Sequence, residues 1–122
     1  MDIRSYKDLI VWQKARLLVR LVYEITRSFP KEELYGLSLQ MRRAAVSVPS
    51  NIAEGYGRGT RKEYIHFLQT ARGSLYELET QLLLAADMNY MTADQAALVA
   101  HQVGESSRLL FGLLASLRRE KE

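Results

Sequence analysis

The sequence has no cysteine, two prolines and two histidines among its 122 residues. The absence of cysteine excludes disulfides, thiolate nucleophiles and cysteine-ligated zinc or iron–sulfur sites. It also fits a reducing compartment, so we expect a cytoplasmic protein. Two histidines leave few ways to build a nucleophilic triad or a metal centre.

Long uncharged apolar runs are missing as well. The longest uncharged stretches, such as 44–53 and 95–104, are far shorter than the roughly 18–20 residues that a membrane span needs. The amino-terminal segment carries a charge every few residues, so no apolar targeting region is visible. We therefore expect a soluble protein with no membrane contact.

No segment alternates apolar and polar residues with the period of two that a strand requires. Instead, apolar residues recur at intervals of three and four, the spacing of a packed helix. The clearest repeat consists of Tyr64, Leu68, Ala71, Leu75, Leu78, Leu82 and Ala85. The pattern predicts helices at roughly 6–28, 34–56, 61–88 and 93–119. We expect an all-α, antiparallel up-down four-helix bundle, with residues 1–122 as a single domain.

Residues at the helix boundaries support this assignment. Pro30 ends the first helix, because it has no N–H and keeps the residue before it extended. Thr60 to Glu63 and Thr92 to Gln95 both have the sequence of a capping box at a helix start. Pro49 lies inside the second apolar repeat, so we expect a kink in the second helix near 45–49.

Residues 55–60 read GYGRGT and resemble a phosphate-binding loop at first sight. A P-loop, however, needs G-x-x-x-x-G-K-[ST] after a strand, and a dinucleotide fingerprint needs G-x-G-x-x-G within a βαβ unit. Neither context is present, so we interpret the segment as the corner between the second and third helices. Arg58, Arg61 and Lys62 beside the positive end of the third helix leave open a contact to one backbone phosphate.

The sequence gives little support for a catalytic or metal site. Di-iron bundles need two Glu-x-x-His motifs, and only Glu63 and His66 form one, since Leu98 stands where a second glutamate is required. His66 also lies about 200° around the third helix from its apolar stripe. Neither Ser47 nor Ser50 has a histidine near it in sequence. We expect no enzyme activity, no metal and no other cofactor.

Basic residues gather on the first helix, on the second helix and at the corner before the third helix, although the net charge is only +3. Arg16, Arg20 and Arg27 fall with Tyr23 within about 60° on the side of the first helix opposite its core stripe. Such a face suits contact with phosphates, while the alternative is an ordinary solvated surface. The full set predicted to bind nucleic acid is Arg16, Arg20, Arg27, Arg42, Arg43, Arg58, Arg61 and Lys62.

The first helix is more apolar than a monomeric bundle requires. Its apolar residues cover about 200° of the helix, whereas an amphipathic helix usually shows about 100°. We expect self-association through this excess, the alternative being a generous core. The predicted oligomer interface consists of Ile10, Trp12, Leu17, Val19 and Leu21.

The run RRAAVSVPSNIAEGYGRGTRKEYIHFLQTARGSLYELETQL, preceded by FPKEELYGLSLQ, resembles the small four-helix-bundle family named for proteins encoded in intervening sequences of bacterial 23S ribosomal RNA genes. The resemblance extends from DLIVWQKA to the fourth helix, and 43–58 is its most specific part. It implies an antiparallel bundle and a ring-shaped homopentamer. A related branch of the family includes the accessory variability determinant of diversity-generating retroelements. Similarity to that branch implies a basic pentameric barrel that binds nucleic acid and a reverse transcriptase.

The resemblance carries no catalytic residues onto this chain. Ser50, Asn51 and Glu54 match family positions, but beside Pro49 they are equally suited to satisfying backbone groups freed by a kink. Our first hypothesis is a non-enzymatic oligomer that binds structured nucleic acid, such as ribosomal RNA or an RNA–protein complex, through phosphates. The second is a ring that acts as a scaffold for a partner protein without binding nucleic acid.

Overall fold

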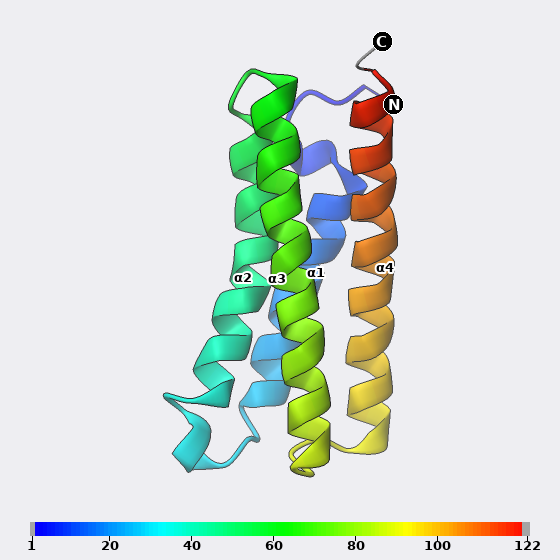
Figure 1. Cartoon of the computed structure of the whole chain (residues 1–122). Helices are drawn as coiled ribbons and strands as arrows, with labels where there is room; N and C mark the ends of the chain where they lie inside the picture. Colours follow the sequence, from blue (N-terminus) through cyan, green and yellow to red (C-terminus); the bar gives the residue numbers. More distant parts are fainter. Residues whose placement is uncertain (1, 121–122) are drawn as a thin grey trace.

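The computed structural model describes residues 2–120, which form four α-helices and contain no strand. The helices are α1 (Ile10–Thr26), α2 (Leu37–Tyr56), α3 (Arg61–Asp87) and α4 (Ala93–Arg119), with short 3-10 helices at η1 (Tyr6–Asp8) and η2 (Lys31–Glu33). The predicted all-α four-helix bundle is confirmed. In Figure 1 the colours run down α1, up α2, down α3 and up α4.

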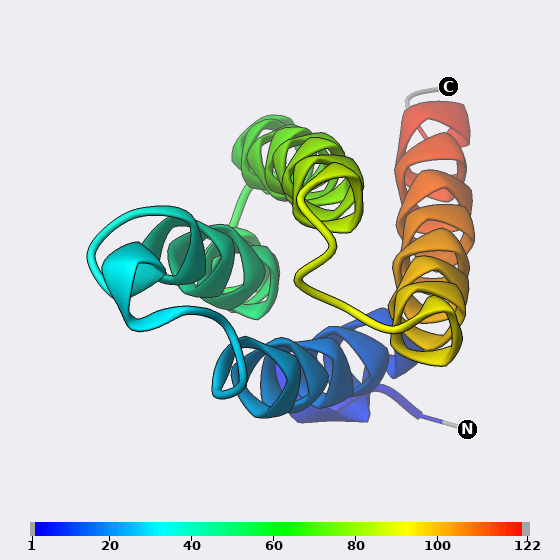
Figure 2. The ribbon, with the colours of Figure 1, turned by 90° about the horizontal axis from the view of Figure 1, so that it is seen from below.

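The helices follow one another around the bundle in sequence order, so that each packs against two neighbours (Figure 2). Most residues at their centre are spaced by three and four, because such positions share one face of a helix. Fully buried members from the four helices include Leu18, Val22, Met41, Val48, Ile52, Leu68, Leu75, Leu78, Val99, Leu110 and Leu114. Each buried apolar side chain of this size stabilises the fold by about 1.5–3 kcal/mol.

The first two helices begin later than predicted. Ser5 caps the 3-10 turn η1 by accepting from the Lys7 amide, and Leu9 is extended, so α1 starts at Ile10. Before α2, Gly36 allows a close approach of Glu33, whose Oε1 would lie 2.7 Å from a Cβ at that position. Because η2 and Gly36 form a turn, α2 begins only at Leu37.

Prolines and caps act mostly as their positions suggest. α1 ends at Thr26, ahead of Pro30, while α2 continues through Pro49 without a break. The kink at Pro49 stays a prediction. Thr92 and Gln95 form both hydrogen bonds of the predicted capping box.

The capping box predicted at the start of α3 is only half formed. The Thr60 hydroxyl accepts from the Glu63 amide at 3.2 Å. The reciprocal bond is not made at this cap, and the Glu63 carboxylate lies 3.8 Å from the Nε of Arg58. Among the described helices, none combines the length and apolarity that crossing a bilayer requires.

Candidate nucleic-acid interface

The glycine corner between α2 and α3 is shaped by packing. A Cβ on Gly55 would lie 2.8 Å from the Cβ of Phe67 and 3.2 Å from the ring of Tyr64, so only glycine lets the two helices approach this closely. Gly59 has a φ of +92°, the left-handed geometry that turns the chain into α3. Burial, with a smaller effect of Tyr56, raises the pKa of Tyr64 to about 12. These residues have structural roles at the corner.

The three cations at this corner differ in their surroundings. The Nε of Arg58 lies 3.2 Å from a carboxylate oxygen of Glu54, and its guanidinium lies 4.8 Å from the centre of the Phe67 ring. Arg61 and Lys62 are exposed in the first turn of α3 and form no ion pair within residues 2–120. Arg61 and Lys62 therefore offer charge to a phosphate more readily than Arg58 does.

The side chain of Arg42 connects α2 to α1. Its Nε donates a 2.8 Å hydrogen bond to the hydroxyl of buried Thr26, and its guanidinium lies 4.7 Å from the centre of the Tyr23 ring. Arg43 is exposed, but it lines a hollow on the other side of α2, together with Glu77 of α3. Arg42 and Arg43 therefore lie on different surfaces of the bundle, although they are neighbours in the sequence.

The basic stripe of α1, which consists of Arg16, Arg20 and Arg27, is solvent-exposed as predicted from its spacing. Arg16 lies 5.6 Å from the centre of the Trp12 ring. Arg20 forms a 3.3 Å ion pair with Glu24 one turn later, an exposed contact that stabilises little. Arg16 and Arg20 line one hollow on α1 beside Trp12 and Leu17, so the structure brings these two cations together.

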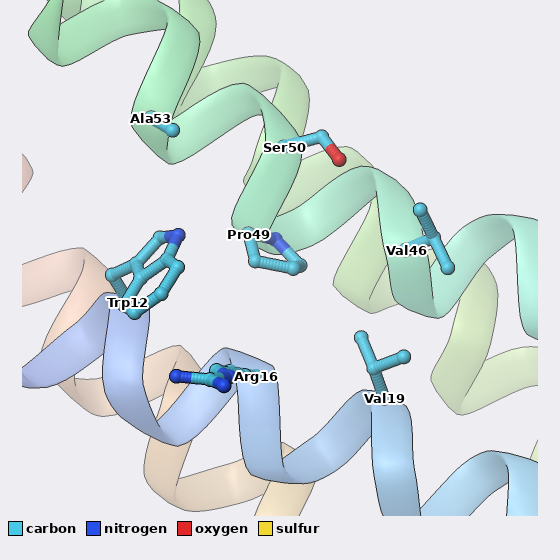
Figure 3. A pocket seen from close by; sticks show the side chains of 7 residues that line it. All are labelled: Trp12, Arg16, Val19, Val46, Pro49, Ser50 and Ala53. Carbon is cyan, nitrogen blue, oxygen red and sulfur yellow. The ribbon is translucent and has the colours of Figure 1, made fainter. Parts of the chain in front are cut away.

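A groove between α1 and α2 adjoins this stripe, and the sequence interpretation did not identify it. The α1–α2 groove has a volume of about 350 Å³ and is shown in Figure 3. Its lining residues are Trp12, Arg16, Val19, Val46, Pro49, Ser50 and Ala53. The α2 members are spaced by three and four, as a second stripe beside the core stripe, and this spacing is the signal that was available in the sequence.

The residues of the predicted oligomer interface fall into two groups. Trp12, Val19 and Leu21 are partly buried and pack against the core of their own bundle. Ile10 and Leu17 have exposed fractions of 61% and 52%. Much of the apolar arc on α1 thus belongs to the bundle itself, and the exposed excess on α1 lies at Ile10 and Leu17.

Polar residues of the SNIAEG segment are largely engaged within the bundle. Asn51 donates to the carbonyl oxygen of Ser47 at 2.8 Å and to its hydroxyl at 2.9 Å. The Ser47 hydroxyl lies 2.7 Å from that of Ser74 on α3. Glu54 pairs with Arg58, while Ser50 is exposed at the α1–α2 groove. Asn51 and Glu54 therefore have internal partners that account for their placement.

The histidine that the sequence placed in a Glu-x-x-His motif lies at the surface. His66 is exposed on α3, facing away from the core as predicted, and its ring contacts Phe67 edge to face. Within residues 2–120, histidine and carboxylate side chains form no group of three or more arranged to hold a metal ion.

Comparison with known proteins gives a family and solved structures with a similar fold. A model of the family described as 23S rRNA-intervening sequence protein matches residues 7–112. The crystal structure of a protein of unknown function from the S23 ribosomal protein family of Bacteroides thetaiotaomicron VPI-5482 is similar, with a TM-score of 0.79 and 25% sequence identity. The similarity covers 89% of this chain and 98% of that one. No curated protein matches the chain.

Proposed function

The chain belongs to the 23S rRNA-intervening sequence protein family, and we propose that it is a non-enzymatic oligomer that binds structured nucleic acid through backbone phosphates. Ribosomal RNA or an RNA–protein complex is the proposed target, and the cytoplasm the proposed location. The observation that carries the proposal is the exposure of Arg16 and Arg20 along a single hollow of α1, continued by Arg27. Cations that follow one helix face can track a phosphate backbone without reading bases.

The structure narrows the residues that we propose to contact phosphates. The hydroxyl of Thr26 holds the guanidinium of Arg42 in place, and the carboxylate of Glu54 partly neutralises Arg58. The other members of the set are exposed, and among them Arg20 has an exposed pair with Glu24: Arg16, Arg20, Arg27, Arg43, Arg61 and Lys62. They lie on more than one surface, so a single copy presents few cations to any one nucleic acid.

Self-association is the second part of the proposal, because it multiplies this limited charge. Ile10 and Leu17 expose apolar surface on α1, and Leu83 and Phe111 do so on α3 and α4, with exposed fractions of 64% and 60%. Exposed apolar residues on different helices suit head-to-tail contacts, which close into a ring when the rotation between copies permits it. The family resemblance implies a pentamer.

Binding of a structured 23S ribosomal RNA fragment at rising salt tests the proposal. Log affinity should fall linearly with log salt, by about 0.7–0.9 for each phosphate contact. The double charge reversal Arg16→Glu/Arg20→Glu should weaken binding and flatten this slope. The matched control reverses Arg118 and Arg119, which are exposed at the end of α4 and outside the proposed set. Absence of binding at low salt would exclude nucleic acid as the target.

Mass in solution, measured by light scattering, tests the oligomer. The substitutions Ile10→Asp and Leu17→Asp place charges on the exposed apolar surface of α1 and should reduce the assembly towards monomer while helicity is kept. Leu34→Asp, which alters a half-exposed residue outside the helices, should leave the mass unchanged. A wild-type monomer would contradict this part of the proposal.

The alternative is a scaffold that docks a partner protein, such as a reverse transcriptase, without binding nucleic acid itself. The exposed apolar surfaces of α1, α3 and α4 support this alternative equally well. An oligomer that binds no RNA at low salt, and whose capture of a partner survives reversal of Arg16 and Arg20, would favour the scaffold.

A further inference from the structure

We propose that the α1–α2 groove receives one unpaired nucleobase, which lies against Trp12 while the adjoining phosphates contact Arg16 and Arg20. The inference rests on the proposed nucleic-acid binding and goes beyond it, since it assigns a base-binding site and a preference for unpaired nucleotides.

The shape of the groove fits a flat apolar group. Figure 3 shows Trp12 on α1 and Pro49 on α2 on opposite sides of the groove, with Val46 and Ala53 along the α2 side. At about 350 Å³ the groove is at the small end of ligand sites, which suits a single base. Aromatic side chains bind bases through their faces, independently of base identity.

The Trp12 ring has a defined position before any ligand binds. Tyr6 contacts it edge to face, with ring centres 5.2 Å apart and an interplanar angle of 71°. Trp12 also packs against the core, so its rotamer is limited by the bundle. A ring that is already oriented loses little conformational freedom when a base stacks on it.

The polar groups around the groove suit a base and its phosphates. None of its lining residues is acidic, and the Arg16 guanidinium is a donor for an adjoining phosphate. Ser50 provides an exposed hydroxyl, in contrast to Ser47 and Asn51, which hydrogen-bond within the bundle. Ring nitrogens and carbonyl oxygens of an unpaired base are acceptors for a hydroxyl such as that of Ser50.

Arg16 links the groove to a path for the phosphates. It lines both the α1–α2 groove and the neighbouring hollow that contains Arg20. The exposed pair of Arg20 with Glu24 is weak enough for a phosphate to displace. The groove and two cations one helical turn apart fit one base with a phosphate on either side of it. An acidic helical peptide would need a site that extends over several helical turns.

The chain contains one tryptophan, so its fluorescence reports directly on the groove. The full-length protein is titrated with an unstructured single-stranded RNA of about twelve nucleotides, an abasic strand of equal length and a perfect duplex. The single strand should quench Trp12 to saturation and bind at least about fivefold more tightly than the abasic strand. The duplex should leave the fluorescence unchanged.

Two variants separate the base site from general phosphate binding. Ala53→Leu fills the groove and keeps Trp12, so it should remove the quenching and the advantage over the abasic strand, while duplex binding is retained. Ala97→Leu, on an exposed part of α4 beside a different groove, is the matched control and should behave as wild type. Circular dichroism of both variants checks that the helices are intact.

The outcomes distinguish this inference from the proposed function. Equal affinity for the abasic and normal strands, without quenching, would overturn the base site while phosphate binding stands. Failure of all three nucleic acids to bind at low salt would overturn both. Saturable quenching by a glutamate-rich peptide, with none by RNA, would assign the groove to a protein partner instead.

Discussion

The hydroxyl of Tyr90 donates a 2.9 Å hydrogen bond to Oε2 of Glu33, across 57 positions of the sequence. The other oxygen of the same carboxylate accepts from the Leu37 amide at 2.9 Å, at the start of α2. One side chain therefore caps a helix and holds the connection between α3 and α4 against it. The hydrogen bond from the Leu37 amide, followed by the one from Tyr90, lowers the pKa of Glu33. The same bond to Glu33 raises the pKa of Tyr90.

The first prediction concerns acid stability. Because the pKa of Glu33 is lower in the folded protein than its ordinary 4.5, the stabilisation is present above pH 4.5 and is lost as pH falls through the folded value. Thermal unfolding of wild type and Glu33→Gln between neutral and acidic pH measures this. The difference in melting temperature should be largest near neutrality and shrink below about pH 4.5. A constant difference would show that the charge of Glu33 contributes nothing.

The same pair also predicts an effect at high pH. The pKa of Tyr90 is raised in the folded protein, so its stabilisation is present below pH 10 and is lost as pH rises through the folded value. Tyr90→Phe removes only the hydroxyl and provides the control, since the gap between it and wild type should narrow in strong base. Calorimetry at alkaline pH checks this outcome.

The second prediction concerns the hydrogen-bonded serines between α2 and α3. Ser74 donates to the Thr70 carbonyl at 3.2 Å, which orients it to accept from Ser47, and Ser47 in turn accepts from Asn51. Ser47→Ala and Ser74→Ala should each lower the free energy of unfolding by about 0.5–1.5 kcal/mol. Urea denaturation of the double variant should show a loss smaller than the sum. Strict additivity would indicate that the two hydroxyls do not interact.

The third prediction concerns the closest approach of α2 and α3. Gly55→Ala places a methyl group 2.8 Å from the Cβ of Phe67, so the helices must separate, at a cost of about 1–3 kcal/mol of unfolding free energy. Gly73→Ala is the matched control, because Gly73 is exposed in α3 and an added Cβ has no atom within 4 Å. It should stabilise the protein by roughly 0.5–1 kcal/mol through helix propensity. Equal effects at both positions would contradict the packing role of Gly55.

The fourth prediction separates the neighbouring arginines of α2. Arg42→Ala should lower the free energy of unfolding by about 1–2 kcal/mol, because it removes the hydrogen bond to buried Thr26 and the stacking on Tyr23. Arg43→Ala should change stability by less than about 0.5 kcal/mol, as an exposed substitution does. Chemical denaturation compares the two. If RNA binding is measured in parallel, the removal of Arg43 should weaken it more than that of Arg42.

Much of the fold follows from local sequence. The spacing of residues such as Leu68, Leu75 and Leu78 predicted both the helical class and the buried face, because residues three and four apart share one side of a helix. Thr92 and Gln95 were predicted as a capping box from four consecutive residues. The starts of α1 and α2 were predicted too early, since η1 and η2 are short turns that the apolar rhythm does not distinguish from α-helix.

The candidate site depended more on tertiary structure. Arg16 and Arg42 have the same charge in the sequence, yet one is exposed beside a groove and the other is bound to Thr26, 16 positions away. Likewise, Trp12 packs against the core while Leu17 remains exposed, although both belong to one apolar arc. Composition and periodicity determined by themselves that four amphipathic helices form and, along most of their length, which side is buried, because these depend on residues a turn apart. Which cations stay free, and where a groove opens, was decided only by the rotation and register of each helix against its neighbours, since partners far apart in sequence meet only once the helices pack.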